Sequence, residues 1–257
     1  MTELGLSGEL GAHRFRVELR QARCLAWGLD FAKGQTGAFG LPPATATAVD
    51  SGGFVGDPAR GGSCRCDTLT MIPHAHGTHT EGVGHLSTIH LSLHQSLTDV
   101  LIPATLVTPD FTGESLSAGH LAAALAPFPE EWRQAVVLRL APAEKAPIDW
   151  TGRARPHVGP DATAWLRQQG CRHLVTDLPS LDPEWDGGTL AAHRAFWNLG
   201  PEEQPLTPAP ETITELAMIP ADLKDGPGLL NMQIAPFDRD AAPSRPVWLP
   251  ITLQPAT

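Results

Sequence analysis

The chain has 257 residues, 42% of them hydrophobic, so it is long enough to bury a sizeable core. Its formal net charge of −10 argues against a nucleic-acid partner, because binding phosphates requires a basic surface. No apolar run is long enough to cross a membrane, and the first residues lack the basic and apolar pattern of a secretion signal. We therefore expect one domain over residues 1–257, located in the cytoplasm and without a membrane partner.

The first third of the chain combines strand patterns with a segment rich in glycine and proline. Apolar and polar residues alternate between Phe15 and Trp27, which suits a pair of strands. Residues 32–62 contain eleven glycines and prolines, which predicts a long irregular segment. Because loops of this length usually bind ligands or cover sites, we expect this segment near the functional site. Thr68 to Ile72 is predicted to be a short strand.

The rest of the chain alternates between strand and helix patterns, which is typical of an α/β protein. Pro103 lies inside one predicted strand and favours a sheet edge or a break there. Asp161 is predicted to cap a helix that ends before Gly170. The strands are predicted at residues 100–107, 135–140 (in the middle of the sheet), 173–177, 229–234 and 245–249, and the helices at 117–126 and 161–169.

The most informative stretch of the sequence is a cluster of histidines between residues 74 and 94. It holds six of the eleven histidines of the chain, whereas an even distribution would place roughly one there. With Glu81, four of these histidines lie within twelve positions, namely His74, His76, His79 and His85. Imidazole and carboxylate groups are the ligands of divalent transition metals, and imidazole is also the commonest general base near neutral pH.

The spacing favours a strand followed by a tight loop. His79 and Glu81 are two residues apart and therefore point to the same face of an extended segment. Gly82 and Gly84 make a helix improbable. His74 and His76 have the opposite parity, so they point away unless Gly77 adopts a bulge or a positive φ. Five other histidines are expected to be surface or hydrogen-bonded core residues, namely His90, His94, His120, His157 and His173.

The same stretch resembles the cyclase-fold family of metal-dependent hydrolases, whose best-known activity is that of kynurenine formamidase (arylformamidase). That family carries the motif His-x-Gly-Thr-His-x-Asp-x-Pro-x-His. The register matches from Gly77 to His85, with Glu81 in place of Asp and Val83 in place of Pro. The first histidine of the motif falls on Ala75, which is flanked by His74 and His76. The chain thus resembles a divergent branch of the family with the variant Gly-Thr-His-Thr-Glu.

Two further segments carry the resemblance. The run from Asp177 to Asp182 is similar to a family segment that precedes a histidine, which is His193 here. Glu215 ends a predicted strand at the position where family members place a metal-binding carboxylate. Residues 218–223 are similar to a short helix of the family. The resemblance implies a swivelling β/β/α fold with a mixed sheet core.

The resemblance also implies a function. Divalent Zn or Mn would be bound by His74 or His76 with His79, Glu81, His193 and Glu215, and His85 would act as the general base. The expected reaction is hydrolysis of a C–N bond in a formamide or amide, or of a cyclic ester, in a small-molecule substrate. The alternative is a binding protein that keeps the fold but has lost hydrolysis, because Ala75 removes one ligand. A homodimer or homotetramer is expected from the same resemblance.

Overall fold

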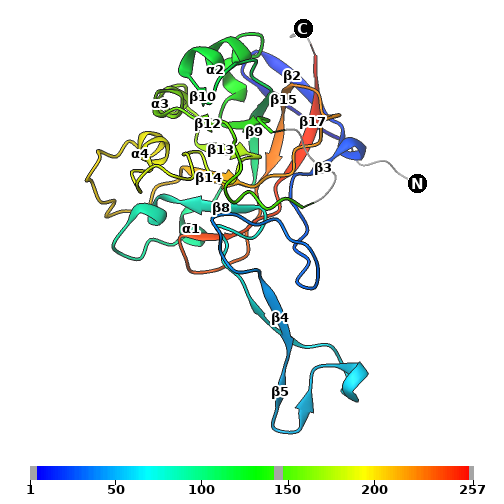
Figure 1. Ribbon diagram of the computed structural model, residues 1–257. Coiled ribbons are helices and arrows are strands. Elements are labelled where there is room, and N and C mark those ends of the chain that lie inside the picture. Colours follow the sequence, from blue (N-terminus) through cyan, green and yellow to red (C-terminus); the bar gives the residue numbers. More distant parts are fainter. Residues whose placement is uncertain (1–4, 142–146, 255–257) are drawn as a thin grey trace.

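The computed structural model of the protein describes residues 5–141 and 147–254, and a large mixed β-sheet dominates it (Figure 1). The sheet has 11 strands in the order β1-β2-β17-β15-β9-β11-β13-β14-β8-β16, with β3 paired to β17. These strands are β1 (Leu6–Leu10), β2 (His13–Val17), β3 (Arg23–Cys24), β8 (His79–Gly82), β9 (Leu101–Val107), β11 (Ala135–Leu138), β13 (His173–Thr176), β14 (Thr212–Glu215), β15 (Gly226–Asn231), β16 (Ala241–Pro243) and β17 (Val247–Gln254). The predicted α/β fold with a mixed sheet is confirmed.

The middle of the sheet consists of the parallel strands β9, β11, β13 and β14. Strand β8 pairs with β14 in the antiparallel direction, and strand β15 pairs with β9 in the antiparallel direction. All four residues of β11 are buried, as expected for an apolar run covered on both faces. The strand predicted at residues 135–140 lies in the middle of the sheet as expected, but it ends at Leu138.

Helices α2 (Ala118–Leu125), α3 (Pro160–Gln168) and α4 (Ala191–Phe196) lie on one side of the sheet (Figure 1). Their apolar side chains, such as Leu121, Leu166 and Phe196, pack with strand residues in one core cluster. The opposite face of the sheet is covered by a second cluster that includes Leu25 and Trp248. A short helix, α1 (Leu93–Ser96), follows the histidine-rich stretch. None of the helices in the described ranges is long and apolar enough to span a membrane.

Several predicted elements differ from the structure for local reasons. Pro103 lies within the unbroken strand β9, because pairing with β11 begins only at Ala104 and the proline needs no N–H on that side. Helix α3 is capped by Gly159 with Pro160 at its first position, so Asp161 lies in the first turn instead. Gly170 follows this helix at φ 86°, as predicted.

Two predictions about pairing and helix content are wrong. Strands β2 and β3 do not pair with each other; both pair with β17, and β2 also pairs with the earlier strand β1. Residues 218–223 do not form a helix: 218–220 have no regular structure, and a turn follows at Ala221 and Asp222. Pro220 explains the absence of helix before it, because a proline disfavours helical backbone at the preceding residue.

Residues 45–70 form an arm that projects from the body of the protein (Figure 1). It is a ribbon of β4 (Thr45–Ala48) paired with β7 (Asp67–Thr70), followed outward by β5 (Asp50–Ser51) and β6 (Phe54–Val55). The prediction of an irregular segment over residues 32–62 is therefore wrong for this part, where alternating threonines favour a strand. The base of the arm lies near the histidine stretch, since Pro42 O is 2.9 Å from Nε2 of His76.

One further pair of short strands and four 3₁₀ helices lie outside the main sheet and the arm. Strands β10 (Ser115–Leu116) and β12 (His157–Val158) pair in the parallel direction. Four 3₁₀ helices connect other elements: η1 (Leu19–Gln21), η2 (Pro58–Arg60), η3 (Val83–Leu86) and η4 (Glu130–Trp132). Of these, η3 matters for the site because it carries His85 directly after β8.

Candidate metal centre

The pairing of β8 with β14 brings three of the predicted ligands together. Glu215 lies directly opposite His79 across the antiparallel pair, so both side chains project from the same face. Glu81 lies two residues after His79 and shares that face. Ligand atoms of His79, Glu81 and Glu215 all lie within 4.8 Å of one another, and all three side chains are buried.

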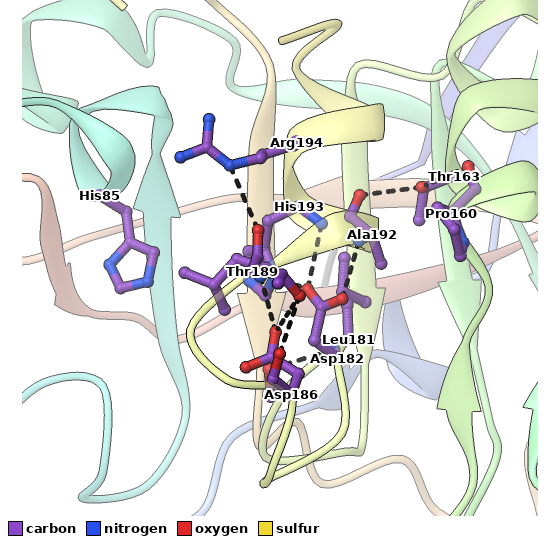
Figure 2. A network of polar contacts seen from close by, with 12 residues as sticks. His85, Pro160, Thr163, Leu181, Asp182, Asp186, Thr189, Ala192, His193 and Arg194 are labelled. Carbon is purple, nitrogen blue, oxygen red and sulfur yellow. Dashed lines mark hydrogen bonds and ion pairs between the residues drawn. The ribbon is translucent and has the colours of Figure 1, made fainter. Parts of the chain in front are cut away.

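His193 approaches the same carboxylates from α4, which covers this face of the sheet. Its Nε2 lies 3.0 Å from Oε1 of Glu81 and 3.3 Å from Oε1 of Glu215. Its Nδ1 lies 2.6 Å from Oδ2 of Asp182, which also accepts hydrogen bonds from the backbone N–H groups of Ala192 and His193 (Figure 2). Asp182 therefore fixes both the start of α4 and the orientation of the imidazole.

A second group of donors lies on the more exposed side of Glu81. Nε2 of His74 is 3.3 Å from Oε2 of Glu81 and 3.2 Å from Oδ2 of Asp240. Nδ1 of His85 is 3.7 Å and 3.6 Å from the same two oxygens. Ligand atoms of His74, Glu81 and His85 also lie within 4.8 Å of one another. We call His79, His193 and Glu215 the inner donors, and His74 and His85 the outer donors. Oε1 of Glu81 faces His193 among the inner donors, and Oε2 faces both outer donors.

Comparison with known proteins places this arrangement in a family. A sequence model of the cyclase family matches residues 18–183. The chain belongs to the cyclase family. None of the curated proteins compared with the chain matches it.

Solved structures share the fold of this cyclase-family chain at low sequence identity. One, described as a potential metal-dependent hydrolase with cyclase activity, has a TM-score of 0.64 at 15% identity, covering 90% of this chain and 98% of its own. A predicted metal-dependent hydrolase from Bacillus stearothermophilus has a TM-score of 0.63 at 14% identity, with 89% and 98% covered. An isatin hydrolase bound to the product analogue thioisatinate has a TM-score of 0.56 at 17% identity, with 91% and 92% covered.

The buried carboxylates of this cyclase-family site favour positive charge beside them. Burial opposes protonation of His74, but its contacts with Asp240 and Glu81 prevail and raise its pKa to about 10. Burial likewise opposes protonation of His193, yet Asp182, Glu215 and Glu81 raise its pKa. Contacts with His74 and His85 lower the pKa of the Asp240 carboxyl group. The site is therefore built to hold cationic charge in a buried place.

The donor atoms fit a metal ion better than they fit one another. Nε2 of His74, Nε2 of His79 and both carboxylate oxygens of Glu81 are buried without a hydrogen-bond partner among the described residues. These atoms lie 3.0–3.7 Å from oppositely charged partners without a hydrogen bond of good geometry, and buried polar atoms that converge in this way suit an ion between them. Nδ1 of His79 lies 3.1 Å from Gly77 O, which leaves Nε2 free to bind an ion. Imidazole and carboxylate donors of this kind suit a divalent metal ion.

The backbone around position 75 decides which flanking histidine joins the site. Gly77 adopts a φ of 79°, one of the two conditions under which a flanking histidine was expected to turn toward the site, and His74 faces Glu81. His76 points elsewhere: its Nδ1 accepts the backbone N–H of Ile72, and its Nε2 lies 2.9 Å from Pro42 O. Ala75 is completely buried. Of the two histidines that flank it, the structure therefore brings His74 and not His76 to the other donors.

Sequence reasoning did not identify Asp182 and Asp240 as site residues. Asp182 ends the run that resembles the family segment before His193, and this position was the available signal. Asp240 had no signal, because only the pairing of β16 with β8 brings it beside Glu81. His173, expected to be either a surface or a hydrogen-bonded core histidine, is the latter: it is buried between Thr212 and Asp99.

Proposed function

We propose that this cyclase-family protein is a metal-dependent hydrolase of a C–N bond in a formamide or a cyclic amide, or of a cyclic ester. The observation that carries the proposal is the convergence of His79, Glu81, His193 and Glu215 on one buried region. A divalent ion held there would polarise the scissile carbonyl and lower the pKa of water. The name of the similar isatin hydrolase supports a cyclic amide as one substrate class.

The site residues would have different roles, which follow from their positions. The inner imidazoles and carboxylates would hold Zn or Mn, and Asp182 would keep Nε2 of His193 directed at it. His85 lies toward the solvent side, with 26% of its side chain exposed, where a substrate can reach it. We assign it the general-base role: Nδ1 accepts a proton from the attacking water and returns it to the leaving nitrogen or oxygen. Proton transfer of this kind contributes roughly 10²- to 10⁴-fold.

Association of identical subunits, as a homodimer or homotetramer, is part of the proposal. The arm of β4 and β7 supports it, because every residue of β7 and most of β4 is exposed in the single chain. An isolated two-stranded ribbon is only marginally stable in water, so a second copy would stabilise it. Sedimentation analysis of the purified protein tests this point, and a monomer at all concentrations would contradict it. A cytoplasmic location remains a prediction.

The alternative is a binding protein that has lost hydrolysis, which Ala75 favours. His74 weighs against it, because this residue faces Glu81 and offers an imidazole in place of the missing one. Screening formamides, cyclic amides and lactones with added Zn²⁺ or Mn²⁺ separates the two functions. Turnover supports the hydrolase, whereas thermal stabilisation by a compound without turnover supports the binding protein.

Metal analysis of purified protein tests the proposal directly. We expect bound divalent metal in the wild type and its loss in His79→Ala. His94→Ala is the matched control, because His94 is an exposed histidine of the same stretch. Unchanged metal content in His79→Ala would contradict the proposal.

A further inference from the structure

We propose that Arg155 is a positioning residue of the metal centre, because its guanidinium holds the loop segment that orients two inner donors, Glu215 and His193. This inference deepens the proposed function and rests on it. The segment consists of residues 180–182, which we call the orienting loop, and it lies between β13 and α4. Arg155 comes from the chain shortly before β12. A side chain from another segment would thus determine how accurately the two donors are placed.

The orienting loop contacts the inner donors at two points. The N–H of Leu181 donates a hydrogen bond of 2.8 Å to Oε1 of Glu215. Oδ2 of Asp182 lies 2.6 Å from Nδ1 of His193. Because both contacts come from neighbouring residues, a shift of the loop backbone would misplace the carboxylate and the imidazole together.

The three carbonyl groups of the orienting loop all accept hydrogen bonds from the segment that includes β12. Nη1 of Arg155 donates to the carbonyl oxygen of Ser180 at 3.2 Å and to that of Asp182 at 3.3 Å. Between them, the carbonyl oxygen of Leu181 accepts the backbone N–H of Val158 at 2.8 Å. The guanidinium therefore bridges the residues on either side of Leu181 and fixes the direction of its N–H group.

The charge of Arg155 makes its role measurable. Burial lowers the pKa of the guanidinium, and the carboxylates of Glu215, Glu184 and Asp182 oppose this effect. Because a guanidinium stays protonated in proteins, Arg155 places a fixed positive charge near the carboxylates of the site. Such a charge repels a divalent ion. Charge alone therefore predicts tighter metal binding after the arginine is removed, whereas positioning predicts weaker binding.

A cavity gives access to the side chain of Arg155. It has a volume of about 580 Å³, and Arg153, Arg155, Glu184 and Trp185 are among the residues that line it. The atoms that Arg155→Ala removes are those of ethylguanidinium, so this cation can enter from the cavity and donate to the same carbonyl groups. Arg153 is exposed and lines the same cavity, which makes Arg153→Ala the matched control.

The Zn²⁺ affinity of Arg155→Ala, measured by competition with a chromophoric chelator, tests the inference. We expect the affinity to fall by roughly 10- to 100-fold, as for other residues that orient metal ligands. Added ethylguanidinium should restore most of the loss. The same concentration of tetramethylammonium, which has the charge but no N–H group, should not. Arg153→Ala should bind Zn²⁺ like the wild type.

The possible outcomes separate this inference from the proposed function. A folded Arg155→Ala variant with unchanged or higher affinity overturns the role of Arg155 and leaves the hydrolase proposal standing. Equal recovery with both cations would make the effect one of charge and overturn it as well. A loss that neither cation restores, with a lower Tm of the metal-free variant, assigns Arg155 to general stability and also overturns it. A wild type that binds no Zn²⁺ overturns the proposed function itself.

Discussion

Asp182 and His193 form the tightest contact of the site, with Oδ2 of the carboxylate 2.6 Å from Nδ1 of the ring and both side chains almost fully buried. Asp182→Asn removes the charge that holds Nε2 toward the inner donors. We expect metal affinity to fall by roughly 10- to 100-fold, as for other residues that orient metal-binding histidines. Competition with a chelator measures this affinity. Asp222→Asn, at an exposed aspartate that is not part of the site, is the control, and equal affinities in the two variants would contradict the role of Asp182.

Gly84 is required by the packing of the segment that carries His85. A Cβ at this position would lie 2.4 Å from the backbone oxygen of Leu91, whereas one at Gly82 would lie 3.4 Å from a side-chain carbon of Leu93. Gly84→Ala should therefore cost about 1–3 kcal/mol of unfolding free energy and displace His85, lowering kcat by roughly 100-fold. Gly82→Ala should be tolerated. Urea unfolding and turnover of the substrate found by screening measure both effects, and equal behaviour of the two variants would contradict the prediction.

The inner part of the site could be predicted because local spacing and one strand pair determine it. Two positions in an extended chain place His79 and Glu81 on one face, and Glu215 needed only the resemblance to be named. The rest depends on contacts that sequence spacing does not contain. Asp240 reaches the site through the pairing of β16 with β8, and His74 through the positive φ of Gly77.

The fold shows the same division between local and distant information. Helix α2 and strand β11 follow from patterns within a few residues, and both were predicted. Strand β2 was recognisable as a strand, but its pairing with β1 and β17 was not. That pairing depends on residues at both ends of the chain. Whether β9 tolerates Pro103 likewise depends on where β11 begins to pair with it, which is at Ala104.

The stability of the protein should depend on Asp177 at mildly acidic to neutral pH. Burial raises the pKa of this carboxyl group to about 7, despite hydrogen bonds from the backbone N–H groups of Leu140 and Ala141. Because the folded protein holds the proton more tightly, this contribution to stability is complete below the unfolded value of 3.8 and is lost as pH rises through about 7. The change is on the order of 1.4 kcal/mol for each pKa unit.

Asp177→Asn provides the test of this pH dependence. The variant cannot ionise, so its unfolding free energy should vary less between pH 5 and pH 8 than that of the wild type, by about 1–3 kcal/mol. Urea unfolding at several pH values gives the comparison. Parallel curves for the two proteins would show that Asp177 does not titrate in this range.

Removal of metal should destabilise the folded protein, because binding to the folded state alone shifts the unfolding equilibrium. At a free Zn²⁺ concentration of 100 times Kd, stabilisation is about 2.7 kcal/mol, which corresponds to roughly 5–10 °C in Tm for a protein of this size. A chelator should reverse the shift. His79→Ala should show a much smaller shift, and an equal shift in this variant would place the metal elsewhere.

Anomalous diffraction from crystals of the Zn²⁺-loaded protein tests the central claim most directly, because it locates the ion without reference to activity. We predict a peak about 2.0–2.2 Å from Nε2 of His79, with Glu81, His193 and Glu215 around it. Crystals in which these side chains stay together with no ion between them, while Zn²⁺ binds elsewhere, would contradict the account.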